Sequence, residues 1–125
     1  MKQEKDIQIR AKAFAVRIIK ISQYLFEKKY WPISNQILRS GTSIGANIYE
    51  AQDSPSSKDF VNKVNISLKE ARETKYWLDL ISEAGIAPEK RLKTIQIELD
   101  EIISILVTII KNTKSRIREN VGMRK

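Results

Sequence analysis

The chain has 125 residues, no cysteine and no histidine, and its 23 basic and 15 acidic residues give it a formal net charge of +8. This length favours a single domain, residues 1–125, with a core large enough to fold without disulfides. The missing residue types exclude Ser–His and Cys–His nucleophile pairs and the usual zinc and iron–sulfur sites, so we expect no enzyme, no catalytic or metal-binding residue and no cofactor.

The first two predicted elements are helices over residues 5–28 and 34–52, separated by Pro32. Apolar residues in the first segment recur at alternating spacings of four and three, which is typical of one buried helical stripe. These residues are Ile7, Ala11, Phe14, Ile18, Ile21 and Leu25. In the second segment, Gly41 and Gly45 lie one turn apart on one face. Each costs about 1 kcal/mol relative to alanine, which predicts close approach of another backbone there.

The third and fourth predicted helices cover residues 56–84 and 88–118, followed by a basic tail over 119–125. Ser56 and Asp59 match a capping box at the start of the third helix, and Gly85 is a stop signal at its end. Both helices carry continuous heptad-like seams. The third seam is Phe60, Val64, Ser67, Ala71, Thr74, Leu78 and Ile81, and the fourth is Leu92, Ile95, Leu99, Ile102, Leu106, Ile109 and Thr113.

Short connections between the four helices predict antiparallel neighbours, and therefore an all-α, up-down-up-down four-helix bundle. An arrangement in which subunits exchange helices is the alternative. The fourth helix has more apolar residues than one bundle uses, because a bundle helix needs about three apolar positions in seven. We therefore expect a homo-oligomer. Its candidate interface residues on the fourth helix are Ile103, Ile105, Val107 and Ile110.

Polar residues among the apolar seams of the second and third helices form a second group of candidates. They are Arg39, Ser43, Asn47, Glu50, Lys63, Glu70 and Glu73. One interpretation is a ligand or metal site between helices, although carboxylate bundles of that kind also use histidine. The other is a buried or half-buried hydrogen-bond and ion network that sets the register of the helices.

The positive charge is concentrated at the two ends of the chain, since residues 1–29 and 111–125 each carry +5 and the middle is nearly neutral. Basic ends are typical of proteins that bind RNA or DNA, but they also occur as solvated surfaces that keep a protein soluble. The candidate phosphate contacts are Lys111, Lys114, Arg116 and Arg118.

No signal peptide or membrane-spanning segment is apparent. Residues 1–10 are polar, and the longest nearly apolar run, residues 102–110, is far shorter than the ~20 residues that cross a bilayer. We therefore expect a cytoplasmic protein without membrane contact.

Three segments carry a family resemblance: Gln36–Glu50, Ser57–Phe60 and Ser67–Leu78. Asn-Ile-x-Glu in the first and Glu-Thr-x-Tyr-Trp-Leu in the third resemble the bacterial four-helix bundle family, also called 23S ribosomal RNA intervening-sequence proteins. The likeness covers about residues 8–115. Leu38 stands where the family often has a second arginine, and Ala51 where it often has glycine, so a basic role of the second helix is not carried over.

The resemblance implies an antiparallel bundle that assembles into a ring, a homopentamer, and it implies no enzymatic activity. Some members of the family are encoded in insertions within ribosomal RNA genes, and a related retroelement accessory protein looks like a nucleic-acid-binding barrel. We therefore expect a noncatalytic oligomer that binds RNA or DNA through its basic ends. The alternative is a protein–protein scaffold or adaptor.

Overall fold

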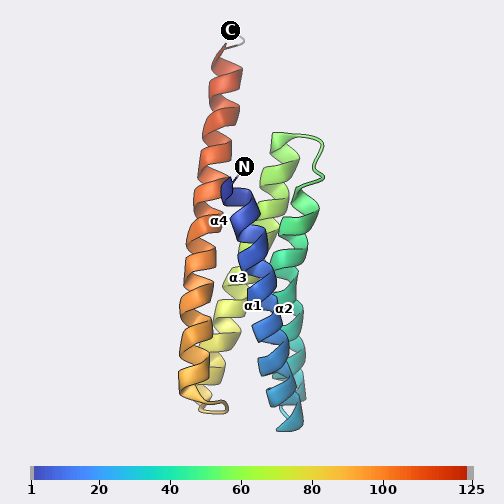
Figure 1. Cartoon of the computed structure of the whole chain (residues 1–125), viewed down its shortest axis with the longest axis vertical. Helices are drawn as coiled ribbons and strands as arrows, with labels where there is room; N and C mark the ends of the chain where they lie inside the picture. Colours follow the sequence, from blue (N-terminus) through green and yellow to red (C-terminus); the bar gives the residue numbers. More distant parts are fainter. Residues whose placement is uncertain (1, 124–125) are drawn as a thin grey trace.

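The computed structural model describes residues 2–123, with side chains described from 5 to 122, and these residues form four α-helices and no strand. The helices are α1 (Lys2–Glu27), α2 (Trp31–Ala51), α3 (Ser57–Ala84) and α4 (Glu89–Met123). Consecutive helices run in opposite directions, and the α2–α3 connection lies at the same end as the chain's N-terminus (Figure 1). The prediction of an all-α fold with four helices is confirmed.

Three helix boundaries differ from the sequence prediction by three residues or more, and one of them is the start of α1, which lies at Lys2 and not at residue 5. Helix α2 begins at Trp31, because Pro32 lies in its first turn, where a missing N–H costs no helical hydrogen bond. The predicted start at residue 34 treated the same proline as a break. Helix α4 continues through 119–123, which were predicted as a tail. The last two residues of that predicted tail, 124–125, lie outside the described residues.

The two predicted caps of α3 are confirmed. The Oγ of Ser56 accepts a hydrogen bond from the backbone N–H of Asp59 at 3.1 Å, and thereby satisfies a donor of the first turn. Gly85 ends the helix with φ of 66°, a left-handed conformation that glycine adopts without a Cβ penalty.

The core consists of the predicted seams with one exception. All six stripe residues of α1 and all seven of α4 are buried, and Phe14 is the largest of the fully buried side chains. In α3, Phe60 is only half-buried, and Val61 lies in the core beside Val64. Small hydroxyl residues sit where helices approach most closely: Ser22 bonds Ser34 between α1 and α2, and Thr74 bonds Ser40 between α2 and α3.

The two glycines of α2 both face α1. A Cβ at Gly45 would lie 3.5 Å from the backbone of Ala11, in ordinary van der Waals contact, which confirms the expected backbone approach at this residue. At Gly41 the neighbour is a side chain, since a Cβ there would lie 2.7 Å from Cγ2 of the buried Ile18.

These two sites predict opposite effects of alanine. Gly41→Ala is expected to lower the free energy of unfolding by about 1 kcal/mol, since overpacking of ~1–3 kcal/mol exceeds the ~1 kcal/mol gained in helix propensity. Gly45→Ala is expected to raise it by up to about 1 kcal/mol, because the methyl group fits. Urea denaturation followed by circular dichroism measures both. Equal stabilisation by both variants would contradict the packing of Ile18 against Gly41.

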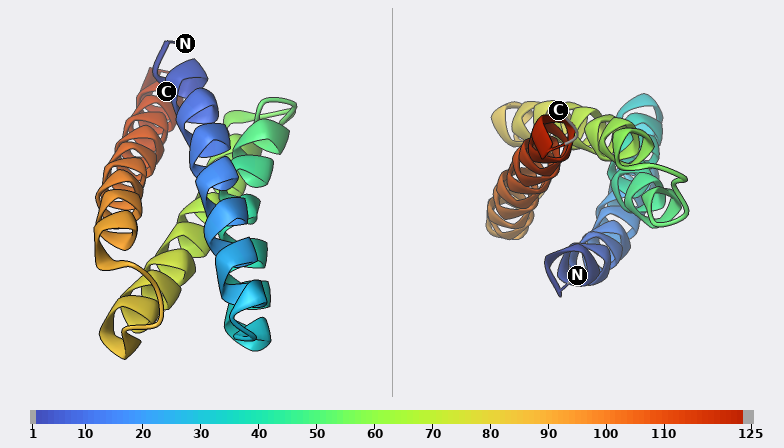
Figure 2. Two further views of the ribbon diagram at one scale, coloured as in Figure 1. Left: turned by 60° about the horizontal axis from the view of Figure 1, so that its bottom comes forward. Right: turned by 90° about the horizontal axis from the view of Figure 1, so that it is seen from above.

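The four helices surround the core in chain order, and α1 and α4 make the least extensive contact of the neighbouring pairs. Seen from above, these two helices stand apart (Figure 2). Two ion pairs bridge them: Arg10 with Glu101 at 3.1 Å and Arg17 with Glu98 at 2.7 Å. Between α3 and α4, the Lys75 ammonium donates to Asp100 at 2.9 Å, and this hydrogen bond raises the pKa of Lys75 above its ordinary value.

Candidate functional site

The last turns of α4 project past the other three helices at the end of the molecule that holds the α2–α3 connection (Figure 1). Lys111, Lys114 and Arg118 are exposed on the C-terminal part of α4, and their spacing of three and four residues places them on one helical face. None of the three forms an ion pair with another described residue. This set of cations is therefore open to an anionic partner, and we call it the α4 basic face.

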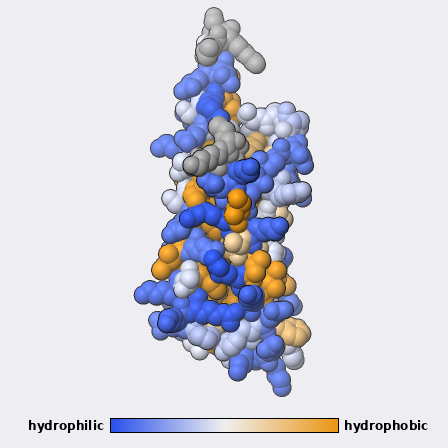
Figure 3. Space-filling model, viewed as in Figure 1, coloured by the Kyte–Doolittle hydropathy of each residue, from blue (hydrophilic) through white to orange (hydrophobic). Residues whose placement is uncertain are grey.

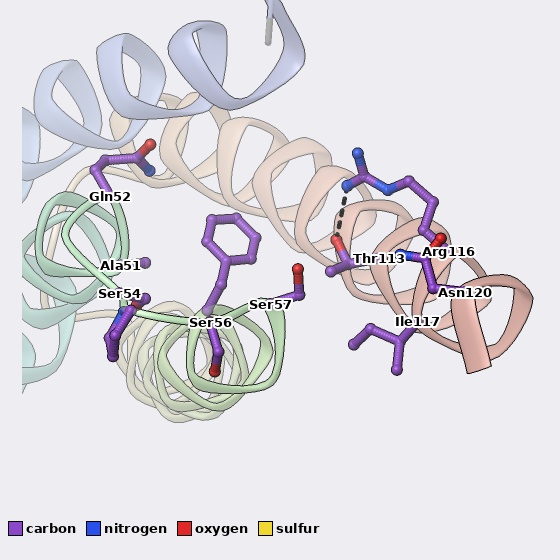
Figure 4. A pocket seen from close by; sticks show the side chains of 11 residues that line it. Ala51, Gln52, Ser54, Ser56, Ser57, Thr113, Arg116, Ile117 and Asn120 are labelled. Atoms are coloured by element: carbon purple, nitrogen blue, oxygen red, sulfur yellow. Dashed lines mark hydrogen bonds between the residues drawn. The ribbon is translucent and has the colours of Figure 1, made fainter. Parts of the chain in front are cut away.

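Arg116, the fourth predicted phosphate contact, lies on another side of the helix. One of its guanidinium nitrogens donates to Oγ1 of Thr113 at 3.3 Å, as the dashed line in Figure 4 shows. Arg116 and Asn120 line a cleft of about 590 Å³ whose opposite wall is the α2–α3 connection. The sequence predicted all four cations as candidate phosphate contacts, and the structure places Arg116 apart from the α4 basic face.

The basic residues of α1 do not join this face. Arg10 and Arg17 are paired with glutamates of α4, as described above, and Lys28 lies at the opposite end of the molecule with its ammonium 5.6 Å from the centre of the Tyr24 ring. The N-terminal excess charge is therefore distributed along the whole length of α1, because a helix of 26 residues extends ~39 Å.

The predicted polar network between α2 and α3 divides into two ion-pair clusters. In the first, the Arg39 guanidinium bonds Glu70 at 3.3 Å and also bonds Glu73, whose carboxylate accepts a second hydrogen bond from Nε1 of Trp77 at 3.0 Å. In the second, the ammonium of Lys63 donates to Glu50 at 2.8 Å. The first cluster joins the two helices across their outer groove.

Two members of the predicted network bond only within their own helix. The hydroxyl of Ser43 donates to the backbone carbonyl of Arg39 at 2.6 Å. The side-chain amide of Asn47 donates to the backbone carbonyl of Ser43 at 2.8 Å. The first cluster is more exposed to solvent than a buried network would be, since the Arg39 side chain is 51% exposed and the Glu70 side chain is 17% exposed. The clusters therefore join the surfaces of α2 and α3 and do not occupy the core.

The position of Glu73 predicts a measurable contribution to stability. Glu73→Ala is expected to lower the free energy of unfolding by about 1 kcal/mol, because it leaves the half-buried indole N–H of Trp77 without its acceptor. Glu50→Ala is the matched control and should change it by less than about 0.5 kcal/mol, since that pair is solvent-exposed. Thermal unfolding compares the two. An equal loss for both variants would contradict a special role of Glu73.

The predicted interface on α4 is not an exposed apolar face. Ile110 belongs to the core, and Ile103 and Ile105 are half-buried against it. Only Val107 is well exposed, at 40%. The prediction is wrong for Ile110 because neighbouring helices within the same chain cover more of α4 than a three-in-seven stripe. The outward-facing apolar residues of α1 and α2 were not predicted as an interface, although their heptad spacing was a usable signal.

The described residues contain no group of three or more carboxylate side chains arranged to hold a metal ion. Within residues 2–123, no helix combines the length and apolar character needed to cross a membrane.

The sequence of this chain is similar to that of a known protein family. The sequence profile of the 23S rRNA-intervening sequence protein family matches residues 3–108. The chain belongs to this family. It is also similar to a solved structure from Bacteroides thetaiotaomicron VPI-5482, a protein with unknown function from the S23 ribosomal protein family. The two share 45% sequence identity with a TM-score of 0.82, over 84% of this chain and 98% of that one.

None of the curated proteins compared matches this chain. The family match ends at residue 108, and the α4 basic face begins at Lys111. The cations of that face therefore belong to a part of the chain that the family profile does not describe. Their role must be argued from their own chemistry.

Proposed function

We propose that this protein is a noncatalytic, self-associating helical protein that binds RNA or DNA through phosphate contacts made by the α4 basic face. The observation that carries the proposal is the arrangement of Lys111, Lys114 and Arg118, three exposed cations on one face of a projecting helix. Phosphate contacts from such side chains supply affinity and carry little sequence preference.

The dimensions of the basic face suit a nucleic-acid backbone. Lys111 and Arg118 are seven residues apart, which corresponds to ~10 Å along the helix. A DNA duplex presents about six phosphate charges over that length, so three cations can each meet a phosphate of the same groove edge.

Self-association would multiply the number of phosphate contacts that one assembly can make. Each added copy contributes another α4 basic face, and the number of counterions released on binding grows with the number of faces that reach one nucleic acid. The membership of the chain in a family named for sequences within ribosomal RNA genes supports nucleic acid as the partner.

The test compares two triple variants in a fluorescence anisotropy titration with labelled RNA and DNA duplexes at low salt. K111Q/K114Q/R118Q removes the basic face. K69Q/R72Q/K93Q removes three exposed cations from α3 and the start of α4, and serves as the charge-matched control. We expect the first variant to lose at least tenfold in affinity and the control to lose much less.

Equal losses in both variants would contradict the assignment to the α4 basic face. No binding of the wild-type protein to either duplex at low salt would overturn the nucleic-acid function altogether. A stoichiometric protein partner that co-purifies without nucleic acid would then favour the scaffold function.

A further inference from the structure

The outer side of the α1–α2 hairpin carries most of the apolar surface that the subunit leaves uncovered. Eight of the thirteen exposed large hydrophobic residues among the described residues lie on this hairpin. They are Ile9, Val16, Ile19, Phe26, Tyr30, Trp31, Leu38 and Tyr49. Those on α3 and α4 are fewer and are separated by polar residues. Figure 3, in which α1 lies in front, shows apolar patches between the charged side chains of this side.

These residues belong to two further heptad stripes. The outward stripe of α1 follows spacings of three and four through Ile9, Lys12, Val16, Ile19, Gln23 and Phe26. That of α2 runs through Trp31, Asn35, Leu38, Thr42, Gly45 and Tyr49. Only one of the twelve positions is charged, and stripes of this period are the pattern with which helices pack on other helices. The core uses different stripes of both helices, and ten of the twelve positions are exposed, while Thr42 and Gly45 are half-buried and Gly45 lies against Ala11 of α1.

The hairpin face carries an exposed aromatic pair at one end, beside a hollow of about 490 Å³, and a second hollow near the other end. The rings of Phe26 and Trp31 lie 6.3 Å apart, and their residues are 56% and 50% exposed. Near the opposite end, the small residues Ala15, Gly45 and Ala46 line a mainly apolar hollow of about 470 Å³. Trp31 and Ala46 are fifteen residues apart on one helix, about 22 Å, so the aromatic pair cannot fill this second hollow of its own chain.

We infer that a second copy of this chain covers the hairpin face, and that Phe26 and Trp31 of one subunit enter the hollow beside Gly45 and Ala46 of its neighbour. A second copy supplies both the aromatic pair and a hollow of matching apolar character. The inference rests on the self-association in the proposed function and is independent of nucleic-acid binding.

The size of the face supports a stable contact. Two adjacent helices of 21 and 26 residues, each about 10 Å wide, present roughly 600–800 Å². Stable protein interfaces bury about 800 Å² on each partner.

Disulfide trapping tests this contact directly, because the chain contains no native cysteine. The double variant W31C/A46C cannot close a disulfide within one chain, since its two Cα atoms would have to approach within ~7 Å. Under mild oxidation without nucleic acid, we expect it to form covalent oligomers of the 14.5 kDa subunit. The single variants W31C and A46C are the controls and should remain largely uncross-linked.

A second measurement detects loss of assembly without cross-linking. Ala46→Trp fills the hollow from an exposed position, and light scattering is expected to show at least a tenfold weaker self-association than in wild type. Ala84→Trp, at the end of α3, adds the same side chain elsewhere and should assemble as wild type does. Circular dichroism confirms that all variants keep their helices.

Three outcomes would overturn the inference: a wild-type protein that stays monomeric at tens of micromolar, a double cysteine variant that cross-links no more than the single ones, and an Ala46→Trp variant that assembles normally. Any of them combined with intact nucleic-acid binding would refute the interface and leave the α4 basic face as proposed.

Discussion

Phe14→Ala is expected to lower the free energy of unfolding by about 3–5 kcal/mol, which is a large part of the stability of a domain of this size. Phe14 is fully buried, lies midway along the stripe of α1, and is the largest of the fully buried side chains. Truncation removes apolar contact area and leaves a cavity that the surrounding isoleucines and leucines only partly fill. Urea unfolding at constant protein concentration measures the loss.

Tyr76→Ala is the control for this prediction. It removes an aromatic ring of similar size from a residue that is 60% exposed on α3, where the ring makes one edge contact with Trp77. Its expected cost is less than about 1 kcal/mol. If both variants lost the same free energy of unfolding, the position of Phe14 in the centre of the core would be wrong.

The second large effect is a loss of nucleic-acid affinity with salt. If the three cations of the α4 basic face each contact one phosphate, the logarithm of the binding constant should fall with a slope of about −2.7 against log[salt] for a duplex. Raising the salt from about 50 to 200 mM then weakens binding by roughly 40-fold. Anisotropy titrations over this range give the slope.

The variant K111Q/K114Q/R118Q sharpens the salt experiment. With the three contacts removed, its slope should approach zero, and the same change of salt should alter any residual binding little. A slope as steep as that of wild type would show that the phosphate contacts lie elsewhere on the molecule. The most direct alternative location is the unpaired lysines of α1, among them Lys5 and Lys20.

The candidate sites were only partly predictable from the sequence. Spacing along α2 and α3 brought Arg39, Glu70 and Glu73 together correctly, because residues three or four apart share a helical face and adjacent antiparallel helices align their faces. It could not show that Ser43 and Asn47 bond their own helix, since this choice depends on side-chain rotamers. The spacing that places Lys111, Lys114 and Arg118 on one helical face also places Arg116 on another.

The self-association surface shows a different limit. The many isoleucines of α4 suggested an interface there, but an excess of apolar residues does not reveal which neighbour covers them. Within the subunit, Ile110 is already buried in the core, and Ile103 and Ile105 are partly buried against it. The uncovered apolar area lies on the α1–α2 hairpin, where the pattern is weaker because glycine, threonine and asparagine occupy part of the stripe.

The sequence by itself determined the four helices, the caps of α3 and nearly the whole core, because helix period, caps and stop signals act over a few neighbouring residues. It also determined the exclusion of histidine and cysteine chemistry. Only the tertiary structure decided which charges are paired across α1 and α4, which cations stay open, and which apolar stripes remain uncovered. Those properties depend on distances between residues far apart in the chain, and the packing of the helices sets these distances.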